Sequence, residues 1–107
     1  MIQMQKVVKK MDDLGYAEAT IGTRYFREAV EIAATQARAM MCKDVYPTIA
    51  ARHGCKPADV ERAMRTATEK AKRGPLWEWA WREMGGVNAP TNSEVIWRLV
   101  RECTDED

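Results

Sequence analysis

Residues 46–73 read YPTIAARHGCKPADVERAMRTATEKAKR, and this stretch contains two helical patterns separated by a short break. Ile49 and Ala50 give the first pattern an apolar side. Gly54 can adopt the left-handed conformation that ends a helix, and Pro57 suits the first turn of the next helix, where a missing N–H costs nothing. The small Ala50 lets two helices that cross at a short turn approach closely. The stretch therefore predicts a helix-turn-helix.

The second of these helices separates its residues into two faces. Apolar residues recur at spacings of three and four, at Val60, Ala63, Met64, Ala67 and Ala71. Polar residues lie away from that stripe, at Glu61, Arg62, Arg65, Thr66, Glu69 and Lys72. Any amphipathic surface helix has this pattern. Here, however, the turn residues and the apolar positions agree on one unit whose polar face is free to read DNA.

Charge is distributed unevenly along an almost neutral chain. The 107 residues include 17 Lys plus Arg and 16 Asp plus Glu, which gives a formal net charge of +1. Residues 43–73 contain eight basic and four acidic residues, so this segment has a charge of +4 and the remainder a charge of −3. One basic module in a neutral protein fits local docking on a duplex, and a basic solvated face is the alternative.

Length and composition limit the class of protein. With 46% hydrophobic residues, we expect residues 1–107 to form one domain with one core. No run approaches the ~18 apolar residues of a membrane span, and the first ten residues lack the apolar centre of a secretory signal. Cys42, Cys55 and Cys103 share no Cys-x-x-Cys spacing, as in proteins of reducing compartments. We expect a cytoplasmic protein without membrane contact.

Metal binding and catalysis find little support in the sequence. His53 and Cys55 are close together, but a zinc site needs about four ligands, and the other soft candidates are only Cys42 and Cys103. The chain has one histidine, no Gly-rich phosphate loop and no Ser or Cys nucleophile motif. We therefore expect no enzyme, no metal and no cofactor. A metal-linked sensor that uses His53 and Cys55 stays open as a rival hypothesis.

The remaining segments also have helical period, and none alternates like a strand, so we expect an all-α fold. A first apolar stripe consists of Met4, Val7, Val8, Met11 and Leu14, and Gly15 closes it as a helix cap. A longer, central helix is expected from about Thr20 to Met40. Its wide stripe contains Tyr25, Phe26, Ala29, Val30, Ile32, Ala33, Ala37 and Met40.

Two shorter helices follow a break at Gly74 and Pro75. The first has apolar positions at Leu76, Trp77, Ala80, Trp81 and Met84 and ends at Gly85-Gly86. Trp77 and Trp81 have the spacing of core residues, which leaves Trp79 to project elsewhere.

The last helix begins with a capping box formed by Thr91 and Glu94. Its apolar stripe contains Val95, Ile96, Leu99, Val100 and Cys103. Trp97 lies off the stripe, so it is a candidate partner surface, with packing against a neighbouring loop as the alternative.

Three blocks of residues carry a family resemblance. They are Leu14-Gly15 with Gly22, Tyr25 and REAV at 27–30; YP-x-IA at 46–50 with VERAMR at 60–65; and PTNSE at 90–94. These strings are specific in combination. Over about Leu14 to Arg101, the chain resembles the C-terminal effector domain of the master response regulators that initiate sporulation in bacteria.

The resemblance implies a compact bundle of about six helices that binds a short DNA box through its helix-turn-helix. It further implies two copies in tandem on neighbouring boxes, and RNA polymerase as a protein partner. Glu61, Arg62 and Arg65 match the base-reading positions of the family, and Thr66 occupies a position that is often His. Arg can donate two hydrogen bonds to guanine, and Glu can accept one from cytosine. The candidates for phosphate contacts are Lys43, Arg52, Lys56 and Lys72.

The chain also departs from the family pattern, at Thr66 and in a shorter connection before Tyr46. Family members normally carry an N-terminal receiver domain, and we expect none here, which makes the chain a stand-alone effector or an excised domain. We predict a sequence-specific transcriptional regulator that binds double-stranded DNA. The rival hypothesis is a helical interaction module that pairs with a full-length relative through the last helix and Trp97.

Overall fold

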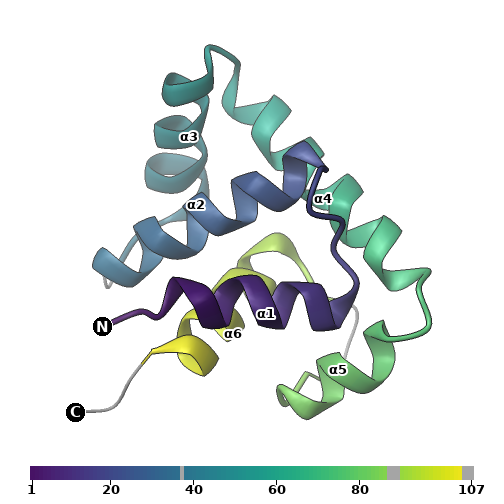
Figure 1. The fold of residues 1–107 in the computed structure, drawn as a ribbon. Coiled ribbons are helices and arrows are strands. Elements are labelled where there is room, and N and C mark those ends of the chain that lie inside the picture. The colour runs from purple at the N-terminus through teal and green to yellow at the C-terminus, as the bar shows by residue number, and fades with distance from the viewer. Residues whose placement is uncertain (37, 87–89, 105–107) are drawn as a thin grey trace.

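Helices make up most of the computed structural model, which describes residues 1–36, 38–86 and 90–104 (Figure 1). Its α-helices are α1 (Met4–Leu14), α2 (Ile21–Thr35), α3 (Tyr46–His53), α4 (Pro57–Lys72), α5 (Trp77–Glu83) and α6 (Asn92–Cys103). A π-helical turn, η1 (Met41–Val45), leads directly into α3. The described residues contain no strand, so the predicted all-α bundle of about six helices is confirmed. None of the described helices has the length and apolar character needed to cross a membrane.

Helix α2 is the central element and packs against α1, α3, α4 and α6. Its apolar stripe is buried as predicted, and Phe26 and Ala29 are fully inaccessible. The helix ends earlier than predicted, at Thr35, because Gln36 has an extended backbone. Met40 is then 54% exposed and its N–H donates to the Asp44 carboxylate at 2.7 Å, so Met40 is the N-cap residue of η1 and does not continue α2. Ala37, also predicted in that stripe, lies outside the described residues.

Helices α2 and α4 cross at an unusually small residue. Gly22 is buried near the start of α2, and a Cβ atom there would overlap the carbonyl oxygen of Ala63 and lie 2.7 Å from the Cβ of Ala67. The two backbones can approach this closely only because Gly22 has no side chain and the facing residues of α4 are alanines. This crossing fixes α4 against the centre of the bundle.

Aromatic rings fill the space between α1, α2 and α5. The Trp77 and Trp81 rings stack with their centroids 5.6 Å apart, and Tyr16 contacts Phe26 and Trp77 edge to face. Trp79 is 66% exposed, as its spacing predicted. Leu76 is 53% exposed, so its predicted place in the core is wrong: it precedes α5 as the N-cap residue and lies outside the helical stripe.

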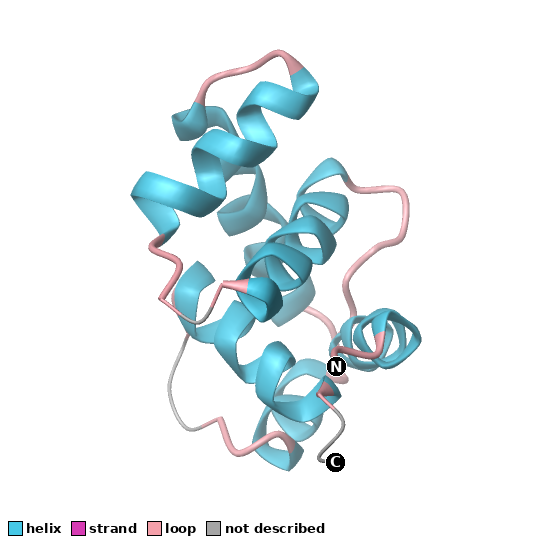
Figure 2. Cartoon of the chain, turned by 90° about the vertical axis from the view of Figure 1, so that its left-hand side faces the viewer, coloured by secondary structure: helices cyan, strands magenta, loops and turns pink. Residues whose placement is uncertain are grey.

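Helix α6 returns the chain to its beginning. The Glu94 N–H donates to the Thr91 hydroxyl at 3.2 Å, and the Thr91 N–H donates to the Glu94 carboxylate at 3.3 Å, which confirms the capping box. At the other end, the Gln3 N–H donates to the Cys103 carbonyl at 2.8 Å. The two ends of the described chain therefore lie side by side, as Figures 1 and 2 both show.

Candidate nucleic-acid interface

Helices α3 and α4 form two consecutive helices joined by a three-residue turn. Gly54 ends α3 with a φ of 67°, and the Cys55 N–H closes that end by donating to the Ala50 carbonyl at 3.1 Å. Pro57 is the first residue of α4, and the Asp59 carboxylate accepts the Lys56 N–H at 3.2 Å. As predicted, Gly54 ends α3 and Pro57 begins α4. The order of the elements is that of a helix-turn-helix.

The inner face of α4 is held in the core. Val60, Met64, Ala67 and Ala71 are buried as predicted, whereas Ala63 is only partly buried. Thr68 is also buried, which the sequence pattern did not indicate. Its hydroxyl shares a hydrogen bond of 2.7 Å with the Tyr16 hydroxyl, so a polar group can lie on this face without an unpaired donor.

The outer face of α4 presents three of the four predicted base-reading residues to solvent. Arg62, Arg65 and Thr66 are exposed, and Glu61 is half-buried. Arg62 and Arg65 are three positions apart, so their guanidinium groups leave the helix on neighbouring sides, one turn apart along the axis. The major groove of B-form DNA is wide enough to admit an α-helix.

Glu61 and Arg65 form an ion pair along the helix. The Arg65 Nη1 atom lies 2.8 Å from Glu61 Oε1, and the two side chains are 58% and 34% exposed. A pair this exposed adds little to stability, about 0.5 kcal/mol. Its larger consequence is orientation, because Glu61 restricts the positions that the Arg65 guanidinium can occupy.

The four candidate phosphate-contacting residues differ in their surroundings. Lys43 in η1 and Lys56 before α4 are exposed. Arg52 Nη1 lies 3.1 Å from Glu28 Oε1, and Lys72 Nζ lies 3.6 Å from Glu69 Oε1. Arg52 and Lys72 are therefore each paired with a carboxylate, whereas Lys43 and Lys56 form no such pair within the described part of the chain.

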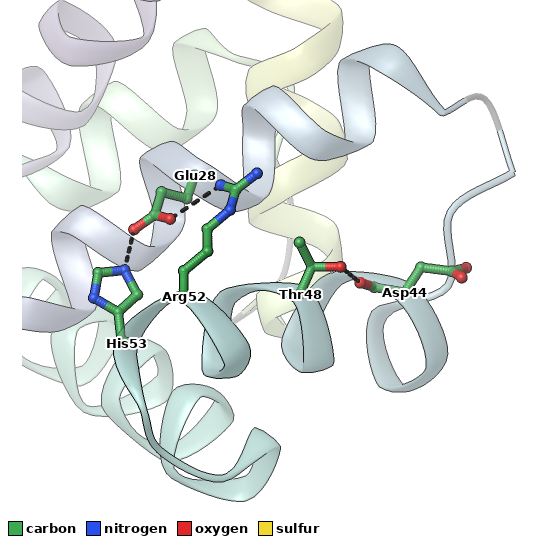
Figure 3. Close-up of polar contacts among 5 residues, drawn as sticks. All are labelled: Glu28, Asp44, Thr48, Arg52 and His53. Atoms are coloured by element: carbon green, nitrogen blue, oxygen red, sulfur yellow. Dashed lines mark hydrogen bonds and ion pairs between the residues drawn. The ribbon is translucent and has the colours of Figure 1, made fainter.

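Glu28 ties the end of α3 to α2, and sequence analysis gave it no role beyond the family resemblance. Its carboxylate pairs with Arg52 and also lies 2.6 Å from His53 Nε2, while Thr48 and Asp44 form a separate contact at the start of α3 (Figure 3). The His53 ring also contacts the Tyr25 ring, with centroids 5.0 Å apart. In the sequence, only the presence of Glu28 in the REAV block of the family resemblance pointed to it. A contact between two helices leaves no regular spacing of residues that could reveal it.

Cys55 and His53 both contact Tyr25, but their polar atoms are directed at different groups. Cys55 Sγ lies 3.9 Å from the Tyr25 hydroxyl, while His53 faces Glu28. Among the residues that the structure describes, no three His, Cys, Asp or Glu side chains are arranged to hold a metal ion. The rival hypothesis of a metal-linked sensor gains no geometric support.

Trp97 is partly buried against the core. Together with Trp81, Gly86 and Arg98 it lines a cavity of about 450 Å³ between α5 and α6. The remaining part of its surface is accessible. Trp97 can therefore pack against the core and still contact a partner.

The sequence matches one family model, described as "Sporulation initiation factor Spo0A C terminal", over residues 7–103. The match begins within α1, ends at the last residue of α6 and contains all of α3 and α4. It confirms the resemblance found over about residues 14–101 and extends it at both ends. No match was found among curated proteins.

Proposed function

The chain belongs to the family of C-terminal domains of the sporulation initiation factor Spo0A, and we propose that it binds double-stranded DNA sequence-specifically as a transcriptional regulator. The family consists of DNA-binding effector domains. The observation that carries the proposal for this chain is the outer face of α4, where Arg62, Arg65 and Thr66 are exposed on the second helix of a helix-turn-helix.

In the proposed complex, α4 lies in the major groove and reads bases. Arg62 and Arg65 each donate two hydrogen bonds to guanine O6 and N7, and Glu61 accepts one from cytosine N4. The ion pair with Glu61 supports this assignment for Arg65, because a guanidinium that is already oriented loses less side-chain entropy on binding. Thr66 contacts a base at the edge of the site.

Phosphate contacts set the register of α4 along the duplex. Lys43, Arg52, Lys56 and Lys72 are the proposed donors, and they carry no base information. Because the net charge of the chain is only +1, general attraction to DNA is weak, and these few contacts should dominate the dependence on salt. A chromosomal target places this activity in the cytoplasm.

Two copies bound in tandem on adjacent boxes are proposed to hold each other through α6. Trp97 is the proposed contact because part of its ring stays accessible at the edge of the core. Trp97→Ala should lower affinity for a two-box duplex and leave affinity for a one-box duplex unchanged. Trp79→Ala is the matched control, since it removes a more exposed Trp from a different helix. Equal two-box affinity in wild type and Trp97→Ala would reject this surface.

RNA polymerase is the proposed protein partner, on the strength of family membership. Purified polymerase should be retained more strongly on a promoter fragment that carries the DNA box bound by the protein when the protein is present than when it is absent. Unchanged retention would remove polymerase from the proposal and would leave DNA binding intact.

Selection of bound sequences from a random duplex pool tests the central proposal. We expect enrichment of one short box, with affinity that falls steeply as salt rises, at a slope of about −0.9 in log K against log salt for each phosphate contacted. Failure to enrich any box, together with no binding at low salt, would reject DNA as the partner. The same result would favour the rival interaction module, in which the last helix and the accessible part of Trp97 pair with a full-length relative.

A further inference from the structure

Asn92, the first residue of α6, connects three helices at one end of the bundle. Its side-chain Nδ2 donates to the backbone carbonyl of Glu61 in α4 at 3.1 Å and to the hydroxyl of Tyr46 at the start of α3 at 3.3 Å. Both bonds are partly shielded from water. One amide group therefore holds α6 against both helices of the helix-turn-helix.

The contact on α4 lies at the part of the helix that is proposed to read DNA. Glu61 is the fifth residue of α4, and its side chain pairs with Arg65 one turn further on. The Glu61 carbonyl has a second lone pair available beyond its bond within the helix, and Asn92 uses that lone pair. Movement of α4 at Glu61 would carry Arg62 and Arg65 with it.

A cavity lies beside the two Asn92 bonds, at the edge of the core that α4 and α6 share. This cavity of about 380 Å³ is lined by Glu61 and Arg65 of α4, by Tyr46 and by residues 90–93. The two hydrogen bonds of Asn92 thus bridge the edge of an open space. Val60 and Met64 of α4 pack in the same core as Val95 of α6, and at the edge of this core the Asn92 bonds add directional contacts that fix the angle of α4.

The chemistry of the two acceptors fits a donor amide. The Tyr46 phenol is neutral at physiological pH, and burial raises its pKa further above its ordinary value. A neutral hydroxyl can accept the Asn92 N–H, and a backbone carbonyl can only accept. A carboxylate at position 92 would face the Glu61 carbonyl with a second acceptor and could not form that bond.

We propose that Asn92 is a positioning residue for base recognition: its bonds to Glu61 and Tyr46 fix the N-terminal half of α4 at the depth and angle at which Arg62 and Arg65 meet the bases. This inference rests on the proposed function, because it concerns how the same face of α4 is aimed at DNA. Asn92 itself contacts no base in this arrangement.

The test uses four variants of the full chain. Asn92→Ala removes both bonds, and Asn92→Asp keeps the size of the side chain but cannot donate to Glu61. An acidic residue in the first turn favours a helix, so Asn92→Asp should keep α6 folded even if Asn92→Ala loses stability. Tyr46→Phe removes one acceptor only. Ser93→Ala is the matched control, since it alters the next residue and leaves both bonds in place.

The measured quantity is the ratio of affinities for the selected box and for an unrelated duplex at the same salt. A change in charge or in general DNA attraction alters both affinities alike and leaves this ratio unchanged. We expect the ratio to fall about fivefold in Asn92→Ala and Asn92→Asp, as for the loss of one hydrogen bond. Tyr46→Phe should reduce it less, and Ser93→Ala should not change it.

The outcomes separate the inference from the proposed function. If wild type prefers its box and both Asn92 variants keep the same ratio while folded by circular dichroism, the positioning role is rejected and DNA reading stands. A loss of thermal stability without a change in the ratio would also reject the role, because Asn92 would then be purely structural. If wild type prefers no duplex, the proposed function fails and the inference fails with it.

Discussion

The two faces of α4 differ in their surroundings, because one is buried in the core and the other is exposed to solvent. On the inner face, Val60 and Met64 are fully buried, and Ala63 and Ala67 lie against Gly22 with no space for a methyl group. On the outer face, Arg62 and Thr66 extend into solvent. A substitution on the inner face should therefore change the stability of the fold, whereas one on the outer face should change what the helix can bind. One helix thus carries stability and recognition on opposite sides, and mutations should separate the two properties.

The largest effect is expected at the crossing of α2 and α4. Gly22→Ala places a methyl group into the carbonyl oxygen of Ala63, and backbone cannot rotate away as a side chain can. Overpacking of this kind costs about 3 kcal/mol of the free energy of unfolding. The sign of the change is informative, because Gly→Ala within a helix otherwise raises the free energy of unfolding by about 0.5–1 kcal/mol. Urea denaturation followed by circular dichroism measures the change.

Gly54→Ala is the control for this prediction. Gly54 has a φ of 67° and open space around it, so an added methyl group meets strain but no neighbour. The left-handed conformation costs about 1–2 kcal/mol in any residue with a Cβ. A Gly22→Ala variant as stable as wild type, beside a Gly54→Ala variant that loses stability as expected, would show that the inner face tolerates a methyl group, and the contrast between the faces would fail.

The next effect concerns the outer face. Arg62→Ala or Arg65→Ala should leave the free energy of unfolding within about 0.5 kcal/mol of wild type, because both side chains are exposed. Each should cost about 1–3 kcal/mol of binding to the selected box and relax base preference at one position. Fluorescence anisotropy on matched and single-substituted duplexes measures both quantities. Wild-type affinity and preference in both folded variants would remove the base-reading role from α4.

Much of this division could be predicted from the sequence, because the helical period reports which side of a helix is buried. Val60, Met64, Ala67 and Ala71 were identified on the inner face of α4 and are buried. The caps at Gly15, Gly54 and Thr91 were predicted for the same reason, since each depends on residues close together in the chain.

Contacts between distant residues could not be predicted in this way. The family resemblance included Gly22, but only the structure shows that it lies against Ala63. The bonds of Asn92 to Glu61 and Tyr46 join residues more than thirty positions apart, and no spacing encodes them. Helix ends were also uncertain where apolar residues continue past them. Met40 and Leu76 have the right spacing for the core but lie beyond the ends of α2 and α5.

A smaller effect is expected from the polar pair on the inner face. Tyr16→Phe leaves the buried Thr68 hydroxyl without the partner that it has at 2.7 Å, which should cost about 1 kcal/mol of the free energy of unfolding. DNA affinity of the folded protein should not change, since Thr68 lies on the face away from Arg62. Thermal and urea denaturation measure the loss. A variant as stable as wild type would show that the Thr68 hydroxyl finds another hydrogen-bond partner.

The same pair predicts a dependence on alkaline pH. Burial raises the pKa of the Tyr16 phenol in the folded protein, whereas the same phenol in the unfolded chain ionises near pH 10. The stability contributed by neutral Tyr16 is therefore complete below about pH 10 and is lost as pH rises from there towards the folded pKa. The stability difference between wild type and Tyr16→Phe should narrow above about pH 10. A stability difference between wild type and Tyr16→Phe that stays constant across pH 8–11 would show that the ionisation of Tyr16 does not cause the pH dependence.

The smallest effect is expected at the edge of the outer face. Lys72 lies seven residues beyond Arg65, about 10 Å along the axis, and its ammonium is 3.6 Å from the Glu69 carboxylate. Lys72→Ala should weaken binding to all duplexes by less than about 1 kcal/mol and reduce the salt slope by about one, without altering base preference. Glu69→Gln should act in the opposite direction, because it leaves the Lys72 charge unshared. Salt titrations on the selected box and on an unrelated duplex measure both variants. A change in base preference in Lys72→Ala would extend the reading surface to the end of α4, and an unchanged salt slope would remove Lys72 from the phosphate contacts.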